Sequence, residues 1–131
     1  MRYIKAKCRL CRQEGEKLFL KGERCYSHIC PIERRSGIKP GQHGPKGSRR
    51  KSDYCLRLRE KQKAKKMFGV NERTFKKYFA IARQSKGETG KRLLQLLETR
   101  LDNIFFKGGL TESRSVARQI INHGFCRSEN M

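Results

Sequence analysis

Six cysteines constrain this chain more than any other feature, because four of them stand as two close pairs within its first 30 residues. Cys8 and Cys11 form a C-x2-C pair, and Cys25 and Cys30 follow after a spacer of 13 residues. The first pair directs two sulfur atoms to one point, and the second completes a tetrahedral set. The spacing therefore predicts a structural zinc site, in a segment with too few apolar side chains for a core of its own.

Other uses of these cysteines share the same spacing. Two disulfides require an oxidising compartment, and the opening residues MRYIKAK contain no signal peptide, which favours reduced thiols and a metal. An iron–sulfur cluster remains the alternative to zinc, since it too is held by four cysteines. His28 lies inside the segment and is an alternative ligand to one cysteine. A closed four-thiolate site leaves no position for a substrate, which indicates a structural role.

The charge of the chain points to a polyanionic partner. The 131 residues contain 33 Lys and Arg against 12 Asp and Glu, a formal net charge of +21, and 35% are hydrophobic. Nucleic acid, acidic lipid and acidic protein all suit such a surface, but no segment is apolar enough to span a membrane. Residues 1–52 carry a net charge of +11 and residues 89–131 only +3. The first two-thirds of the chain should therefore make most contacts with a nucleic acid.

Residues 31–52 contain all three prolines and four of the glycines, and they show neither a strand nor a helix period. We expect an extended loop arm that becomes ordered against phosphate, with a solvated linker as the alternative. Arginine binds phosphate bidentately, and glycine lets backbone N–H groups come close. The candidate RNA-binding residues of the arm are Arg34, Arg35, His43, Arg49, Arg50 and Lys51.

A basic helix is predicted next, capped by Ser52 and ended by Gly69. Its apolar face is narrow, and its cations fall in two rows along the helix. The first row is Arg57, Lys61 and Lys65, and the second is Arg59, Lys63 and Lys66. Beyond the first turn the only carboxylate is Glu60, so pairing within the helix does not explain the rows. The two interpretations are a solvated charged face and a helix along a phosphate backbone, which we favour.

Three further helices are expected to form a small bundle. Asn71 caps the first, which extends to about residue 85 and carries an apolar core stripe. A leucine-rich helix follows over residues 90–101. The last helix, capped by Thr111 or Ser113, ends near His123. The expected core stripe is Phe75, Tyr78, Phe79 and Ala82; the last helix should turn Val116, Ala117, Ile120 and Ile121 inward and Arg114 and Arg118 outward.

No catalytic constellation is visible. The three histidines lie far apart, and the sequence lacks a glycine-rich phosphate loop, a nucleophile motif and paired carboxylates. We therefore expect a binding protein that is not an enzyme and has no small-molecule substrate.

Several long blocks, in a fixed order, resemble the S4 family of bacterial small-subunit ribosomal proteins in its cysteine-containing, zinc-binding form. The blocks are CRLCR (8–12), LKGERCYS (20–27), ERR (33–35), PGQHG (40–44), SDYCLRLREKQKAK (52–65), LLETRLDNIFF (96–106) and SRSVARQIINHG (113–124). The resemblance implies that the four paired cysteines are metal ligands. It also implies that Arg114, Arg118, Gln119 and His123 belong to the RNA-facing helix of a small α/β RNA-binding module.

The same resemblance implies a function in the cytoplasmic ribosome. Members of the family bind small-subunit (16S) ribosomal RNA directly at a helix junction of its 5′ domain, help to nucleate assembly of the small (30S) subunit, contact neighbouring ribosomal proteins and are linked to translational accuracy. The family's module continues into several strands, whereas this chain ends with FCRSENM in place of the first. We therefore expect a C-terminally truncated chain with a mainly α fold.

Three parts are expected: a metal knuckle with the loop arm at 1–52, a helical domain at 53–100 and an incomplete RNA-binding module at 101–131. The alternative function is a zinc-finger nucleic-acid-binding regulator. That function requires a recognition helix after the second cysteine pair, where this chain has a loop rich in Pro and Gly.

Overall fold

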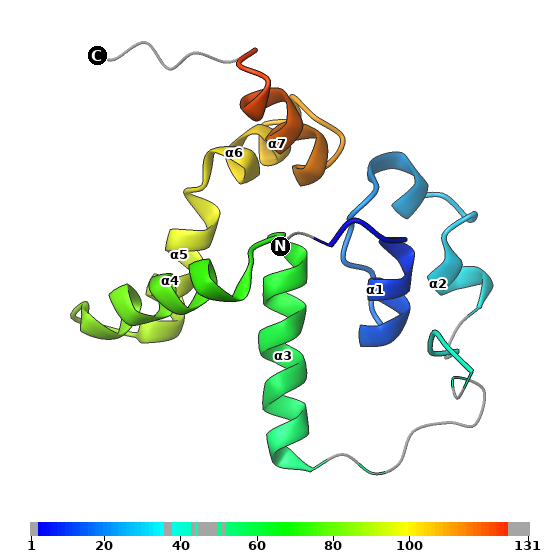
Figure 1. Ribbon diagram of the computed structural model, residues 1–131, viewed down its shortest axis with the longest axis horizontal. Coiled ribbons are helices and arrows are strands. Elements are labelled where there is room, and N and C mark those ends of the chain that lie inside the picture. The colour runs from blue at the N-terminus through cyan, green and yellow to red at the C-terminus, as the bar shows by residue number, and fades with distance from the viewer. Residues whose placement is uncertain (1–2, 36–37, 43, 45–49, 51, 126–131) are drawn as a thin grey trace. The chain divides into compact units, whose positions relative to one another are not determined.

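The structure is a computed structural model, and it describes residues 3–35, 38–42, 44, 50 and 52–125. Within these residues the chain forms seven α-helices and one 3-10 helix, with no strand (Figure 1), which confirms the predicted mainly helical class. The chain divides into two compact units, Met1–Val70 and Asn71–Met131. The expected division into three functional parts stays a prediction.

The first unit begins with short helices that carry the cysteines. Helix α1 (Cys8–Glu14) ends at Gly15, whose φ of 81° lies in the left-handed region that favours glycine. The 3-10 helix η1 (Gly22–Cys25) and helix α2 (Pro31–Arg34) follow. The expected loop arm thus begins with one helical turn, because Pro31 stands at the first helical position, where its missing N–H costs nothing.

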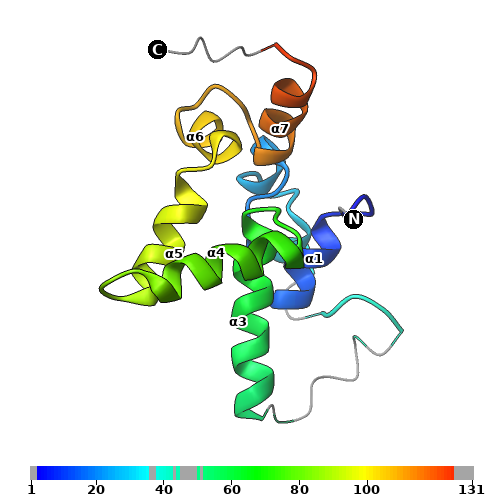
Figure 2. The ribbon, with the colours of Figure 1, turned by 60° about the vertical axis from the view of Figure 1, so that its left-hand side comes forward.

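Helix α3 (Asp53–Met67) is the predicted basic helix. The hydroxyl of Ser52 accepts a hydrogen bond from the N–H of Cys55 at 3.4 Å, which confirms the predicted cap. The chain leaves the helix through Gly69, at a φ of 61°. Figures 1 and 2 show α1 beside α3, and the two helices pack against each other within this unit.

The second unit is a sequence of four helices, each packed against the next (Figure 2): α4 (Glu72–Gln84), α5 (Thr89–Glu98), α6 (Leu101–Lys107) and α7 (Arg114–Asn122). The predicted caps of α4 and α7 are present. Asn71 Oδ1 accepts the N–H of Thr74 at 2.7 Å, and Ser113 Oγ accepts the N–H of Val116 at 3.4 Å.

The apolar core of this unit is narrower than the sequence predicts. Phe75, Ala82 and Leu97 are buried, but Phe79 of the expected stripe is 47% exposed. The leucine-rich helix ends early, because Arg100 takes extended backbone angles and starts α6 at a new direction.

Candidate metal site and nucleic-acid interface

The four paired cysteines come together in the first unit. Cys8 and Cys11 lie one turn apart on α1, Cys25 ends η1, and Cys30 stands at the N-cap of α2. All four are free thiols, so the structure holds no disulfide among them, and all but Cys8 are buried. They line one small cavity together with Arg24, Pro31 and Ile32.

Two backbone amides donate to sulfur atoms of this cluster. The N–H of Lys21 donates to Cys25 Sγ at 3.3 Å, and the N–H of Leu18 donates to the Cys11 thiol. Burial raises the pKa of the Cys11 thiol, the Leu18 amide opposes that rise, and the neighbouring thiols add to it. Amide donors stabilise a thiolate, which is the form that binds a metal.

The cysteine cavity fits a metal in kind. Four thiolates are the donor set of tetrahedral zinc, and the cavity volume of about 10 Å³ is close to the space of one water molecule. In their present positions, no three or more Cys, His, Asp or Glu side chains of the described residues surround a common point closely enough to hold an ion. The sulfur atoms would have to draw together onto it. His28, the alternative ligand, is exposed and does not line the cavity.

The second basic row of α3 is bound to carboxylates of the first unit. Glu14, whose side chain is only 1% exposed, pairs with Arg59 at 3.4 Å and with Lys66. Glu16 pairs with Lys63 at 2.9 Å. These partners lie 45 to 52 positions apart in the sequence, which is why the composition of the helix alone did not reveal them. The row therefore joins α3 to the end of α1.

The first basic row and the loop arm are more open. Arg57 is exposed, as are Arg34, Arg35 and Arg50, whereas Lys61 and Lys65 are half-buried. Three predicted arm residues lie outside the described residues: His43, Arg49 and Lys51.

The arginines of α7 point inward, so their expected place on the outer face is wrong. Arg118 pairs with Asp102, and Arg114 Nε donates to Asn103 Oδ1 at 2.7 Å. The Arg114 guanidinium also lies over the Phe106 ring, 4.4 Å from its centroid. Helical spacing explains the correction, since these two arginines flank the fully buried Ala117, which turns them inward with it. Val116, expected inside, is 42% exposed, and Gln119 and His123 are exposed.

Asp102 and Asn103 form a polar centre in the second unit, with exposed fractions of 5% and 1%. Asp102 accepts from two nitrogens of Arg100 at 3.2 and 3.3 Å and also from Arg118. The Asn103 amide donates to the backbone carbonyl of Glu98 at 3.0 Å and to its carboxylate at 2.6 Å. Sequence reasoning missed this centre, although a polar pair inside the apolar run LDNIFF was a signal for it.

Glu98 connects α5 to α6. Its carboxylate binds Lys107 Nζ at 2.7 Å as well as the Asn103 amide. Burial works to raise the pKa of Glu98, but the hydrogen bonds from Lys107 and Asn103, with the charges of Lys107 and Arg114, outweigh it and lower that pKa.

Both units carry cations on a helical framework, and no helix among the described residues is long and apolar enough to cross a membrane. A mainly helical chain with a net charge of +21 is a basic protein of the kind that associates with polyanions. The family described as ribosomal protein S4/S9 N-terminal domain matches residues 2–98. The chain therefore belongs to the ribosomal protein S4 family, which confirms the resemblance seen in the sequence.

Curated relatives are similar over nearly the whole chain. The small ribosomal subunit protein uS4 of Dictyoglomus turgidum is 58% identical over 123 residues, which is 94% of this chain and 59% of the relative. The uS4 proteins of Thermus thermophilus and Natranaerobius thermophilus are 55% and 54% identical over the same number of residues, with 58% of each relative covered. The chain thus spans less than two-thirds of the length of these relatives.

Proposed function

We propose that this chain is a structural constituent of the small ribosomal subunit in the cytoplasm and binds 16S ribosomal RNA directly. The observation that carries the proposal is its identity of 58% to a small ribosomal subunit protein, over 94% of the chain. The net charge of +21 supports a polyanionic partner. By the family resemblance, the RNA site is a helix junction in the 5′ domain, where binding would help to nucleate subunit assembly, beside neighbouring ribosomal proteins and with a link to translational accuracy.

The proposed mechanism is binding and not catalysis. Lys and Arg neutralise phosphates and release their counterions, and A-form RNA is recognised mostly by its shape and its backbone. The exposed Arg34, Arg35 and Arg57 supply phosphate contacts. The ion pairs of Glu14 and Glu16 hold α3 in a fixed orientation against α1, so its outward face is presented to RNA as a rigid surface.

We infer that Cys8, Cys11, Cys25 and Cys30 hold one zinc ion. Their shared cavity and the two amide donors to sulfur support this inference. A volume of about 10 Å³ favours a single ion over an iron–sulfur cluster, which contains several metal and sulfide atoms. With four thiolates the ion would join α1, η1 and α2 and leave no position open for chemistry.

Helices α6 and α7 are proposed to be the helical start of an α/β RNA-binding module. Gln119 and His123 are exposed on α7 and are therefore the members of the predicted set that are free to reach RNA from this element. Arg114 and Arg118 are proposed to serve the module first through their contacts with Asn103 and Asp102.

The test is the binding of the purified chain to 5′-domain RNA of the small subunit, to an unrelated RNA of equal length and to duplex DNA, across a salt series. We expect preference for the 5′-domain RNA and a loss of affinity of about a thousandfold between low and moderate salt, if six or more phosphates are contacted. Equal binding to all three probes would overturn the proposal.

Preference for one duplex DNA sequence would instead support the zinc-finger regulator. The structure offers little for that alternative. Helix α2, which follows the second cysteine pair, has only four residues, too few for a recognition helix that reaches across a major groove.

A further inference from the structure

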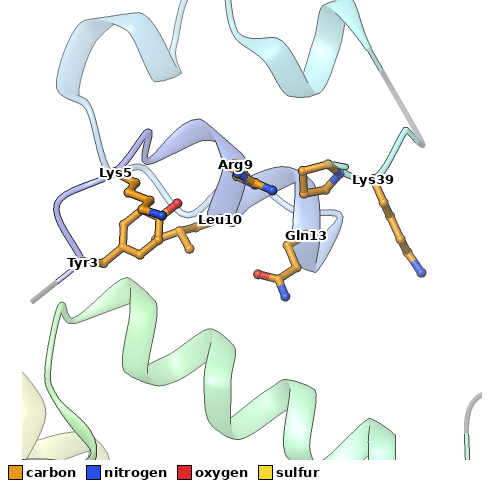
Figure 3. A pocket seen from close by; sticks show the side chains of 7 residues that line it. Tyr3, Lys5, Arg9, Leu10, Gln13 and Lys39 are labelled. Carbon is orange, nitrogen blue, oxygen red and sulfur yellow. The ribbon is translucent and has the colours of Figure 1, made fainter. Parts of the chain in front are cut away.

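A second concave site lies in the first unit, away from the cysteine cavity. Figure 3 shows the hollow between the N-terminal segment, α1 and the segment around Lys39. Its volume is about 510 Å³, within the range of pockets that hold a small organic molecule. Seven side chains line it: Tyr3, Lys5, Arg9, Leu10, Gln13, Lys39 and Pro40.

The charge of this hollow is unbalanced. Lys5, Arg9 and Lys39 contribute to its lining, and no carboxylate does. None of the three forms an ion pair with another residue in the part of the chain that the structure describes. The cations of the second row of α3, in the same unit, all have carboxylate partners. Three like charges around one hollow repel one another unless an anion lies between them.

The remaining lining is suited to a flat aromatic group. The ring of Tyr3 is 42% exposed, and its hydroxyl is held by a hydrogen bond to the carbonyl of Ala6 at 3.4 Å. Leu10 and Pro40 supply apolar surface, and Gln13 supplies an amide beside it. A phosphate alone would leave most of such a hollow unfilled, whereas a nucleotide offers a phosphate to the cations and a base to the tyrosine ring.

We propose that this hollow binds one unpaired nucleotide of RNA, with its base stacked on Tyr3 and its phosphate held by Lys5, Arg9 and Lys39. The inference rests on the proposed function and deepens it, since it assigns the RNA class that this surface takes: a nucleotide outside the duplex at the junction. Stacking tolerates any base, so the site selects an unpaired position and not a sequence.

The first experiment uses two charge-matched triple variants of the full chain. One is Lys5→Gln, Arg9→Gln and Lys39→Gln. The control is Arg83→Gln, Lys86→Gln and Lys91→Gln, which removes the same charge from exposed residues of the second unit. We expect the first variant to lose about tenfold or more in affinity for 5′-domain RNA and to reduce the slope of log affinity against log salt by about 1, with a smaller change in the control. Equal losses in the two variants would overturn the proposal.

The ring has its own test. Tyr3→Leu should weaken RNA binding by about tenfold, and Tyr3→Phe, which keeps the stacking surface, should restore most of it. RNA substituted with 4-thiouridine should form a photocrosslink within residues 3–5, and unlabelled adenosine 5′-monophosphate or inorganic phosphate should not compete at concentrations near the affinity for RNA. Competition by the mononucleotide at such concentrations would assign the hollow to free nucleotides and contradict the RNA proposal.

Failure of the two proposals can be told apart. If the unchanged chain does not prefer 5′-domain RNA, the ribosomal function is overturned, and the crosslink with any bound RNA still decides the hollow. A crosslink within residues 3–5 that Tyr3→Leu abolishes would then support the nucleotide site alone, and its absence would overturn that site as well.

Discussion

At the scale of the residue, the chain uses its few carboxylates to place its many cations. Asp102 binds Arg100 and Arg118, and Glu14 binds Arg59 and Lys66. In each case a nearly buried acid stands between two bases, with 6% and 1% of the side chain exposed. Removing such an acid leaves two partly desolvated cations together, which costs more than the pair itself contributes.

Asp102→Asn should therefore destabilise the second unit by about 2–3 kcal/mol, because the amide keeps the shape but leaves both guanidinium groups uncompensated. The measurement is the free energy of urea unfolding, followed by circular dichroism. Glu112→Gln is the control, since Glu112 is exposed, and it should change stability by less than about 0.5 kcal/mol. A change as small in Asp102→Asn as in the control would show that the buried acid is not needed.

The corresponding change in the first unit is Glu14→Gln, for which we expect a loss of about 2 kcal/mol. Its control is Glu16→Gln, because Glu16 binds a lysine of the same helix but is 59% exposed, where an ion pair contributes about 0.5 kcal/mol or less. Urea unfolding of the two variants in one buffer measures the difference. If both variants lost the same stability, burial of Glu14 would not be the cause.

At the scale of the element, local signals predicted the helices well and the orientation of their faces less well. The caps at Ser52, Asn71 and Ser113 were predictable, because a cap is a contact within three residues. The direction of Arg118 was not, because its partner Asp102 lies 16 residues away on another helix. The gathering of the cysteine pairs followed from spacing, whereas the hollow near Tyr3 depends on segments that no local pattern brings together.

The connection of α5 to α6 through Glu98 makes the second unit sensitive to acid. A lowered pKa means that folded Glu98 binds its proton more weakly than unfolded Glu98 does. Its stabilising contribution is therefore present above the usual glutamate pKa of about 4.3 and is lost as the pH falls through the lowered folded value.

Glu98→Gln should remove this contribution. At neutral pH the unchanged chain should be the more stable of the two, and the difference in the unfolding midpoint should shrink as the pH falls below about 4. Thermal unfolding across a pH series measures it. A difference that stays constant down to low pH would mean that Glu98 acts through its shape and not through its charge.

At the scale of the whole molecule, the two units depend on different means of stabilisation. The second has a core of helix contacts around Leu97 and Ala117, both fully buried. The first has few buried apolar side chains among its short helices, and its largest fully buried one is Leu18, whose N–H donates to Cys11. A chain segment with so little apolar core folds stably when a metal joins its parts.

Removing the proposed ion should therefore unfold the first unit and leave the second folded. The purified chain should contain one zinc per molecule, measured by elemental analysis, and a strong chelator should make residues 3–35 sensitive to protease while residues 71–125 stay protected. Cys11→Ser should bind little zinc and show the same protease pattern without chelator. Cys55→Ser is the matched control, because Cys55 is a free thiol of α3 outside the cysteine cavity, and it should keep its zinc. Equal zinc content in the two variants would place the ion elsewhere, and a protease pattern that the chelator does not change would show that the first unit folds without it.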